Sequence, residues 1–414
     1  NRAINKITMG DGSVKFVEQN LLNTDLTLNL SQNIPWTGGS LFLETSAQRM
    51  DLFSEHKYSW QTSPIMIGYR QSLFGYNSLK WDKRIEPVRY QEAKKSYVET
   101  LELVSANAIN KFFALATAQS NYDIASFNYA NADTLYRYAQ GRYNIGTITE
   151  NEMLQLELNR LTEETNRMNA RIEMDNCMQE LRSYLGIQEE REIRVRVSSR
   201  IPDFSINLNE ALALAYENSP DIQTMKRRKL ESESAVARAR ANAGLKADIY
   251  LRFGLTQTAD KLPEAYRNLL DQQYVSLSIS LPILDWGRGK GQVRVARSNR
   301  DLVYTQVEQS RTDFELNVRK LVKQFNLQTQ RVRIAARTDE TAQRRNEVAR
   351  KLYILGKSTI LDLNASISEK DSARRNYVSA LYNYWSLYYT LRSMTLYDFE
   401  SSKLLTEDYN LLIE

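Results

Sequence analysis

The 414-residue chain has few glycines and prolines, one cysteine and one histidine. Its 15 glycines and 7 prolines are about half of average usage, which predicts few turns and long regular elements. The single cysteine, Cys177, excludes an intramolecular disulfide, and we interpret it as a small packed residue within a helix. The single histidine, His56, excludes a metal site built from several histidines, and we expect it in an exposed loop.

Long hydrophobic runs are also missing. No run of 18 apolar residues is present, so the sequence contains no candidate transmembrane helix. If the chain crosses a membrane, a β-barrel is the other fold that pairs its backbone polar groups within lipid. No secretory signal is present and the first residue is Asn1 rather than methionine, so we expect a processed or trimmed chain.

The charge pattern excludes further classes of function. A net charge of +5 is small for this length, and acidic and basic residues are interspersed. No basic block carries interleaved aromatic residues, so we predict no nucleic-acid partner. We predict no enzymatic activity and no cofactor, because no convincing catalytic triad, metal cluster or phosphate loop is present. The segment 287–291 resembles a phosphate loop but lacks its spacing and terminal hydroxyl, and we interpret it as a strand-to-helix bend.

Two similar segments, 142–152 and 352–362, lie 210 residues apart. Each has a tyrosine, a glycine, a threonine and a carboxylate at one spacing: Tyr143, Gly146, Thr149 and Glu152, then Tyr353, Gly356, Thr359 and Asp362. The glycine predicts a left-handed helix C-cap, because it has no Cβ to clash. The threonine and the acid three residues later predict a capping box. Each segment is therefore predicted to be the tip of a long helical hairpin.

Long helices are expected on both sides of each tip. The segment 88–140 contains neither proline nor glycine, and about 53 helical residues span roughly 80 Å. Pro87 is expected in the first turn of this helix. After the first tip, a 4-3-4-3-4 spacing predicts a coiled-coil seam formed by Leu154, Leu158, Leu161, Thr165, Met168 and Ile172. The remaining helices are expected at 209–215, at 220–244, at about 289–353 and at about 359–397.

Alternating apolar and polar residues predict strands before each hairpin. The strand segments are 26–31, 41–43 and 65–69 in the first half, with turns at 37–39 and 53–62, and 248–253 and 275–281 in the second. The offset of 210 also pairs Tyr76 with Trp286 and Asn107 with Asn317, so we infer an internal duplication. The helical segment 206–245 has no counterpart before residue 35, and we suspect that the N-terminus has been cut.

Neither half can shelter its own strands and helices, because a two-stranded hairpin is marginal in water. Several copies that pool their strands into a barrel and their helices into a bundle would solve this problem. Aromatic residues near the strand ends suit the membrane interfaces of such a barrel: Tyr69, Phe74, Tyr76, Tyr250, Tyr274 and Trp286. From the strands alone, a soluble sandwich with ordinary strand aromatics is equally compatible.

The order of these motifs resembles the TolC family of outer-membrane efflux channels, over about residues 40–397. The matching segments are 71–74 and 281–287 at the strand-to-helix junctions, 209–222 at a repeat start, and 143–146 and 353–356 at the tips. The resemblance implies an internally duplicated α+β membrane protein. It implies a homotrimer with a transmembrane β-barrel of about four strands per chain, continued by a long α-helical barrel in the periplasm.

The resemblance also implies partners and a function. The barrel would contact outer-membrane lipid, and the tips would dock onto a periplasmic adaptor linked to an inner-membrane transporter. The chain would export drugs or proteins passively, in tripartite efflux or type I secretion. The alternative is a soluble coiled-coil scaffold or interaction protein with a small β cap.

The resemblance assigns roles to the tip residues. The docking positions are Asn144, Ile145, Gly146 and Thr147 in the first tip, and Leu355, Gly356 and Lys357 in the second. The family's ring of gate aspartates falls on Asp362, and the tyrosine of its closing network on Tyr353. Ser358 replaces the expected arginine and Ala365 the second acid, whereas Asn151 and Glu152 are the partner positions of the first tip. For Glu152 and Asp362, a carboxylate that only meets the helix dipole is the alternative.

We expect seven consecutive segments. They are N-terminal strands at 1–80, a first hairpin at 81–186, a connector at 187–206, helices opening the second repeat at 207–245, a second strand pair at 246–287, a second hairpin at 288–397 and a tail at 398–414. Residues 1–36 depart from the family, and an added hairpin there would raise the strand count above four.

Overall fold

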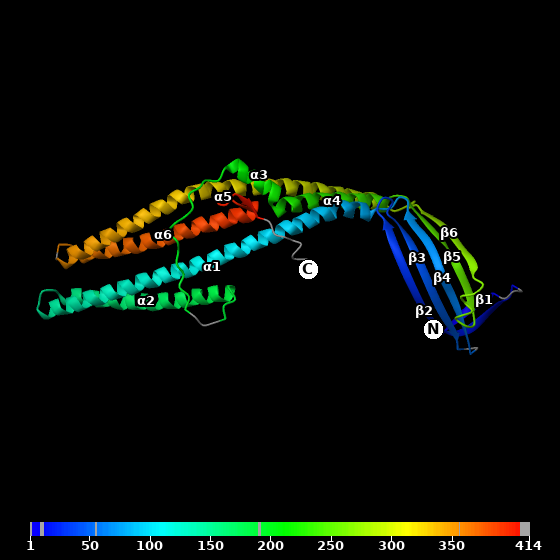
Figure 1. Cartoon of the computed structure of the whole chain (residues 1–414), viewed down its shortest axis with the longest axis horizontal. Helices are drawn as coiled ribbons and strands as arrows, with labels where there is room; N and C mark the ends of the chain where they lie inside the picture. Colours follow the sequence, from blue (N-terminus) through cyan, green and yellow to red (C-terminus); the bar gives the residue numbers. More distant parts are fainter. Residues whose placement is uncertain (1, 9–11, 54–55, 189–191, 356, 406–414) are drawn as a thin grey trace. The chain divides into compact units, whose positions relative to one another are not determined.

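The computed structural model describes residues 2–8, 12–53, 56–188, 192–355 and 357–405 (Figure 1). These residues form a six-stranded sheet, six α-helices and a two-stranded sheet of β7 (Tyr397–Asp398) and β8 (Lys403–Leu404). Their contacts divide the chain into two compact units. One unit is Asn1–Tyr90 with Thr224–Glu308, and the other is Gln91–Gln223 with Gln309–Glu414.

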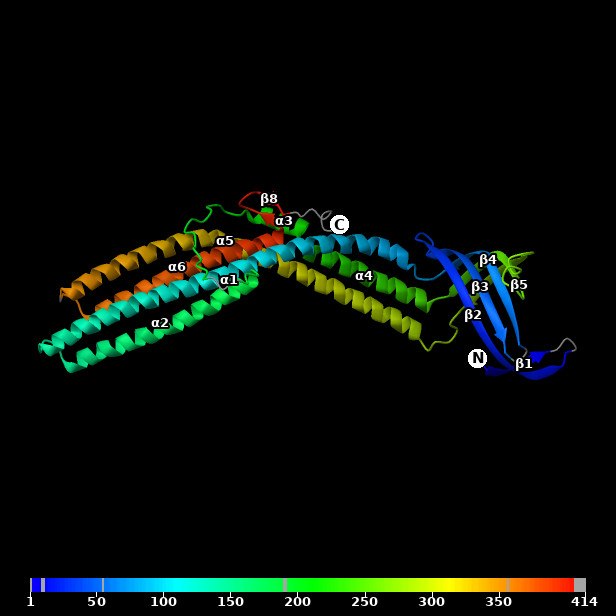
Figure 2. The same ribbon diagram turned by 60° about the horizontal axis from the view of Figure 1, so that its bottom comes forward.

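The sheet belongs to the first unit, and all its neighbouring strands are antiparallel (Figure 2). Its order is β1 (Arg2–Thr8), β2 (Val14–Ile34), β3 (Gly39–Leu52), β4 (Lys57–Ser72), β5 (Lys246–Ala259) and β6 (Leu270–Ser280). The expectation of about four strands is wrong. The extra strands are β1 and β2, and β2 extends over 21 residues, well beyond the alternating segment 26–31. Gly38, with φ of 76°, lets the chain turn into β3.

The strand register separates an apolar face from a polar face. Leu30 lies opposite Leu43, which in turn lies opposite Ile67, and Ile67 lies opposite Phe253. The exposed apolar residues of this face are Leu26, Leu28, Leu30, Leu41, Leu43, Ile65, Ile67, Phe253, Val275, Leu277 and Ile279. Tyr250 and Tyr274 have the opposite parity and lie on the polar face. Their expected place at a membrane interface is therefore wrong.

The long helices follow the predicted order. They are α1 (Ser78–Asn144), α2 (Glu150–Tyr184), α3 (Leu208–Asn218), α4 (Pro220–Ala243), α5 (Arg288–Ile354) and α6 (Ile360–Thr395). The predicted start of α1 at Pro87 is wrong, because the Asn77 side chain caps the helix earlier by accepting from the Lys80 backbone N–H at 3.0 Å. No helix in the described ranges holds a stretch long and apolar enough to cross a membrane.

The strand-to-helix bend predicted at 287–291 is confirmed. The Asp285 carboxylate accepts hydrogen bonds from the backbone N–H groups of Gly287 at 2.9 Å and Gly289 at 2.8 Å. These bonds cap the first turn of α5, and they lower the pKa of Asp285 below its ordinary value. The loop expected at 53–62 is shorter than predicted, since β4 already begins at Lys57, and His56 has a φ of 54° in the turn before it.

The helices α1 and α2 form the first hairpin, and α5 and α6 form the second. Three arginines of α2 lie over tyrosine rings of α1, at 4.3 to 5.6 Å: Arg160 over Tyr136, Arg167 over Tyr129 and Arg171 over Tyr122. A guanidinium over an aromatic ring is stabilising by about 0.5–2 kcal/mol. This Arg–Tyr ladder joins the two helices of the first hairpin along much of α2.

The connector that follows α2 has no strand in its described part, residues 192–207. The side chain of Gln119 takes the place of a partner strand, because it donates to the Ile193 carbonyl and accepts from the Val195 N–H, both at 3.2 Å. Ile193 and Val195 then pack, with Cys177, against a core of Leu115, Ala118, Met174 and Leu181. Burial raises the pKa of the Cys177 thiol, which fits a packed residue rather than a nucleophile.

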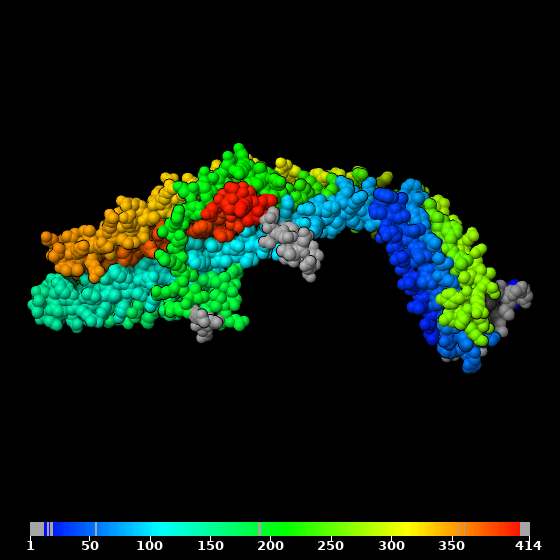
Figure 3. All heavy atoms as spheres, in the orientation of Figure 1, coloured from blue at the N-terminus to red at the C-terminus, as the bar shows by residue number. Residues whose placement is uncertain are grey.

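The predicted coiled-coil seam of α2 is not buried within this chain. Leu158 is 65% exposed and Ile172 is 59% exposed, whereas the buried residues of α2 are Leu156, Met174 and Leu181. The seam prediction is therefore wrong as an intrachain contact, because α2 turns a different face toward α1. In Figure 3, α2 lies along one margin of its unit. We call the exposed residues Leu154, Leu158, Leu161, Met168 and Ile172 the α2 stripe.

Candidate functional site at the hairpin tips and the cleft between the hairpins

The first tip has the predicted left-handed cap and capping box. Gly146 has a φ of 73°, and the N–H groups of Gly146 and Thr147 donate to the carbonyls of Tyr143 and Arg142 at 2.8 and 2.9 Å. These two bonds close the end of α1. The Thr149 hydroxyl accepts from the Glu152 N–H at 3.2 Å, and the Glu152 carboxylate accepts from the Thr149 N–H at 2.9 Å. The tip is thus fixed by its own local hydrogen bonds.

The second tip repeats this arrangement. The Lys357 N–H donates to the Leu352 carbonyl at 2.9 Å, the counterpart of the Thr147 bond. Thr359 and Asp362 form the second capping box. Gly356, the expected docking glycine, lies outside the described residues. Both capping boxes confirm the prediction made from the threonine and acid spacing.

The candidate gate carboxylates are therefore engaged as caps. The Asp362 carboxylate accepts from the Thr359 hydroxyl at 2.8 Å and from the Ser358 hydroxyl at 3.3 Å. Hydrogen bonds from the side chain and backbone of Thr359 lower the pKa of Asp362 below its ordinary value. The carboxylate stays ionised at neutral pH and remains exposed at the tip. This geometry fits the alternative in which the carboxylate only caps the start of α6. It also holds a negative charge in a fixed place at the tip.

Tyr353 brings the second tip close to the first. Its half-buried hydroxyl feels the charges of Arg142 and Glu152 from the first hairpin, and burial raises its pKa above the ordinary value. Asn151 lies exposed beside Glu152 on the first turn of α2. Tyr353 and Tyr138 of α1 line one pocket between the two hairpins.

Apolar side chains project from both tips. Ile145 is 74% exposed and Leu355 is 68% exposed, in the two loops that join the helices of each hairpin. The predicted docking residues therefore present an apolar surface bounded by the charged caps.

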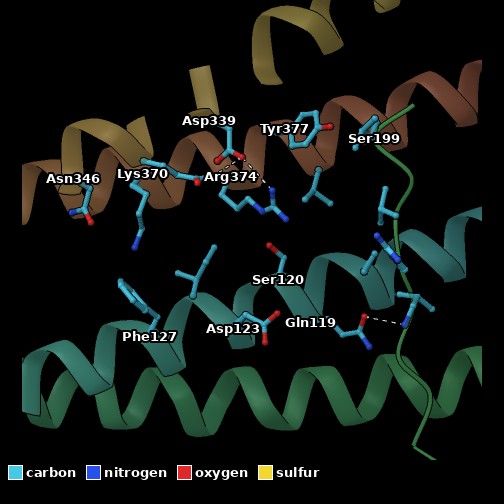
Figure 4. A pocket seen from close by; sticks show the side chains of 18 of the residues that line it. Gln119, Ser120, Asp123, Phe127, Ser199, Asp339, Asn346, Lys370, Arg374 and Tyr377 are labelled. Atoms are coloured by element: carbon cyan, nitrogen blue, oxygen red, sulfur yellow. Dashed lines mark hydrogen bonds and ion pairs between the residues drawn. The ribbon is translucent and has the colours of Figure 1, made fainter. Parts of the chain in front are cut away.

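A cleft of about 680 Å³ lies between the hairpins, among α1, α5, α6 and the connector (Figure 4). Ser120 and Asp123 project into it from α1, and Lys370 and Arg374 from α6. Asp339 of α5 is buried there, and its Oδ2 accepts from Arg374 Nη1 at 3.2 Å. Its Oδ1 has no hydrogen-bond partner in the described part of the chain. The cleft is thus lined by both polar and apolar side chains, with Asp339 and Arg374 paired along one wall.

Polar contacts tie α1 to α6 across the two hairpins. Asn128 Nδ2 donates to Asp371 Oδ2 at 2.6 Å, and the Tyr382 hydroxyl donates to Asn110 Oδ1 at 3.2 Å. The strongest tie is bidentate, because Arg392 Nε and Nη2 donate to the two oxygens of Glu102 at 2.8 and 3.0 Å. The sequence analysis missed these ties. Arg392 does stand out in the sequence, as the only charged residue between Arg375 and Asp398.

The described residues contain no group of three or more histidines, cysteines or acids placed to hold a metal ion. The tips and the cleft therefore offer charged, apolar and hydrogen-bonding surfaces. Such surfaces suit binding and passage.

Comparison with known proteins places this geometry in a family context. Residues 211–395 match the model of the family described as "Outer membrane efflux protein". The outer membrane protein TolC of Escherichia coli strain K12 is 21% identical over 311 residues, covering 72% of this chain. The chain spans 61% of the length of TolC.

Two solved outer membrane channels have a similar fold. The CmeC channel of Campylobacter jejuni matches with a TM-score of 0.67 and 15% identity, over 95% of this chain and 80% of CmeC. The MtrE channel of Neisseria gonorrhoeae, solved in an open state, matches with a TM-score of 0.64 and 12% identity. That match covers 94% of this chain and 81% of MtrE.

Proposed function

We propose that this TolC homologue, a relative of the outer membrane efflux proteins, forms the exit duct of a tripartite efflux or type I secretion system. Its place is the outer membrane, with helices that extend into the periplasm. The similar solved structures are outer membrane channels, and a duct fits the exposed apolar surfaces and the cleft described above. We propose passive transport of drugs or proteins, without chemistry on the cargo.

The observation that carries the proposal is the pair of apolar surfaces that one chain leaves uncovered. The sheet exposes leucine, isoleucine and valine side chains on one face, and α2 exposes the α2 stripe. Exposed apolar areas of this extent mark interaction or membrane surfaces. Lipid would cover the sheet face, and a neighbouring copy would cover the stripe.

The open sheet supports assembly into a barrel. Its edge strands, β1 and β6, each pair on one side only within the described residues. An unpaired strand edge within lipid leaves N–H and C=O groups without partners, which costs several kcal/mol per group. We propose that three copies join edge to edge in one transmembrane β-barrel, and that their helices form the α-helical barrel. We propose that each copy is divided into the seven segments expected from the sequence, with the strand segments in the β-barrel and the hairpins in the α-helical barrel.

The tips would meet the partners. Ile145 and Leu355, with their neighbouring tip residues, would dock onto a periplasmic adaptor that links the duct to an inner-membrane transporter. Asp362, Glu152 and Tyr353 would form the gate, with Asn151 and Ser358 beside them. Support comes from the carboxylates that the two caps hold in place, and from Tyr353, which lines a pocket with Tyr138 of the first hairpin.

Assembly can be tested on the α2 stripe. We expect the detergent-solubilised protein to sediment as a trimer and the Leu158→Glu variant to sediment as smaller species, because the new charge would be buried at a copy-to-copy contact. Analytical ultracentrifugation measures both. Asn166→Glu adds the same charge at an exposed polar position on another face of α2, and it should leave the trimer intact. A wild-type protein that stays monomeric in detergent would contradict the duct.

The gate can be tested by ion selectivity. We expect Asp362→Asn combined with Glu152→Gln to lower the cation preference of the channel in planar bilayers, because two fixed negative charges per chain are lost. The lowered pKa of Asp362 keeps its carboxylate charged to lower pH than an ordinary aspartate, so its contribution to the cation preference should persist as pH falls. Glu150→Gln removes a neighbouring first-turn acid outside the proposed gate and should change selectivity less. Equal selectivity in all these proteins would remove the two acids from the gate.

A further inference from the structure

An aromatic and cationic cluster crosses the polar face of the sheet. The Phe42 ring of β3 stacks on the Tyr250 ring of β5, with centroids 5.8 Å apart, and Tyr250 meets Tyr274 of β6 edge-on at 5.8 Å. The guanidinium of Arg70 lies 5.4 Å from the Tyr250 ring, and that of Arg252 lies 6.0 Å from the Tyr274 ring. We call these five residues the arginine–tyrosine cluster.

The strand register builds this cluster. Arg70 on β4 lies directly opposite Tyr250, and Arg252 on β5 lies directly opposite Tyr274. Cross-strand neighbours on one face have Cβ atoms about 5 Å apart, so each arginine reaches the ring beside it. Gly68 of β4 leaves room for the Phe42 ring, because a Cβ there would lie 2.0 Å from the Phe42 Cζ. The cluster is thus held by backbone pairing and by one glycine.

The two guanidinium charges of the cluster are not neutralised. Within the described residues, the side chains of Arg70 and Arg252 form no ion pair and no hydrogen bond. The Nε of Arg252 is buried without a partner, and an unsatisfied buried donor costs about 1–3 kcal/mol. Stacking on a ring fixes the guanidinium plane and leaves its N–H donors free at the edge. The cluster therefore presents fixed, unsatisfied donors of positive charge.

Arg49 provides an internal comparison. It also lies over aromatic rings, at 5.0 Å from Tyr58 and 5.8 Å from Trp60. In its case Asp51 neutralises the charge through a contact of 2.7 Å. By register, Arg49 belongs to the apolar face. The sheet thus pairs its stacked arginine on the apolar face and leaves two stacked arginines unpaired on the polar face.

We propose that the arginine–tyrosine cluster is a binding site for anionic groups, such as carboxylate, sulfonate or phosphate, on molecules that pass along the polar face. Arginine binds such oxyanions through paired N–H···O bonds, and the tyrosine and phenylalanine rings add a stacking surface for aromatic cargo. The inference rests on the proposed duct, in which the polar face lines the lumen. There, one cluster per copy attracts anions and opposes the cation preference of the tip carboxylates.

Conductance in planar bilayers tests the site. We expect the double variant Arg70→Gln, Arg252→Gln to shift the permeability ratio toward cations by about twofold, because the positive charge of the cluster is lost. Naphthalene-2-sulfonate should reduce the wild-type current and should have a weaker effect on the double variant. Arg49→Gln removes an equally stacked but neutralised arginine, and it should change neither result. An unchanged permeability ratio and unchanged block in the double variant would overturn the proposal.

A second variant separates charge from geometry. Arg70→Lys with Arg252→Lys keeps both charges and removes the paired donors. We expect this variant to retain the permeability ratio and to lose block by naphthalene-2-sulfonate. If the glutamine variant does not assemble, block of the lysine variant is the deciding measurement. Full block in the lysine variant would contradict recognition by the guanidinium. A wild-type protein that conducts no ions would instead contradict the duct itself, so the two failures are distinguishable.

Discussion

The Glu102→Ala variant is expected to lower the free energy of unfolding by about 3 kcal/mol, because it leaves Arg392 buried without its bidentate partner. The two side chains are only 11% and 16% exposed, so water replaces the lost carboxylate poorly. Asp398, at 3.4 Å from Arg392 Nη1, remains as a weaker partner and keeps the loss at the low end of the range for a broken buried pair. Denaturant unfolding of the detergent-solubilised protein, followed by circular dichroism, measures the loss.

The control for this experiment is an exposed ion pair in the same unit. Asp203 pairs with Arg333, and their side chains are 70% and 64% exposed. Exposed pairs contribute about 0–1 kcal/mol, so Asp203→Asn should leave the unfolding free energy nearly unchanged. Equal losses in Glu102→Ala and Asp203→Asn would mean that the contact between Glu102 and Arg392 does not hold α1 to α6.

The Gly68→Val variant is expected to prevent normal assembly of the sheet. The valine Cβ would lie 2.0 Å from Phe42 Cζ and 2.5 Å from Phe42 Cε1, so the Phe42 ring of β3 must move away from Gly68 of β4. Overpacking of this kind costs about 1–3 kcal/mol, and here it also breaks the stack of Phe42 on Tyr250. The yield of trimer after detergent extraction, measured by sedimentation, should fall severalfold.

Two further variants give this prediction its specificity. Phe42→Ala in the Gly68→Val background removes the colliding ring and should recover much of the trimer. Gly291→Ala places a Cβ where no atom lies within 4 Å, in the first turn of α5, and should be tolerated. If Gly68→Val assembles as well as Gly291→Ala, the close seat of the Phe42 ring is not needed by the sheet.

The hairpin tips could be predicted from sequence because their structure is decided locally. A glycine that adopts a positive φ ends α1, and a threonine with an acid three residues later starts α2. The same rule predicted the start of α6 from Thr359 and Asp362. Each of these contacts spans only a few residues, so the spacing alone contains the information.

The contacts between distant segments could not be predicted in this way. Glu102 and Arg392 are 290 residues apart, and no local sequence pattern around either residue indicates which residue it pairs with. The periodicity of α2 identified a continuous apolar stripe correctly, but it could not tell whether the stripe faces α1 or another molecule. Pro87 lies inside α1, in its third turn, because the start of the helix is fixed earlier by the Asn77 cap. The extra strands, β1 and β2, lie in residues 1–36, where an added hairpin was expected from the departure from the family pattern.

Each tip separates the residues that shape the turn from those that face outward. In the first tip the fold depends on backbone bonds, on Gly146 and on the pair Thr149 and Glu152, while the Ile145 side chain is 74% exposed. Substitutions at Ile145 or Leu355 can therefore alter what the hairpin recognises without disturbing how it forms. With the docking role proposed above, this division would let a lineage exchange one docking partner for another in small mutational steps, with each intermediate still able to fold.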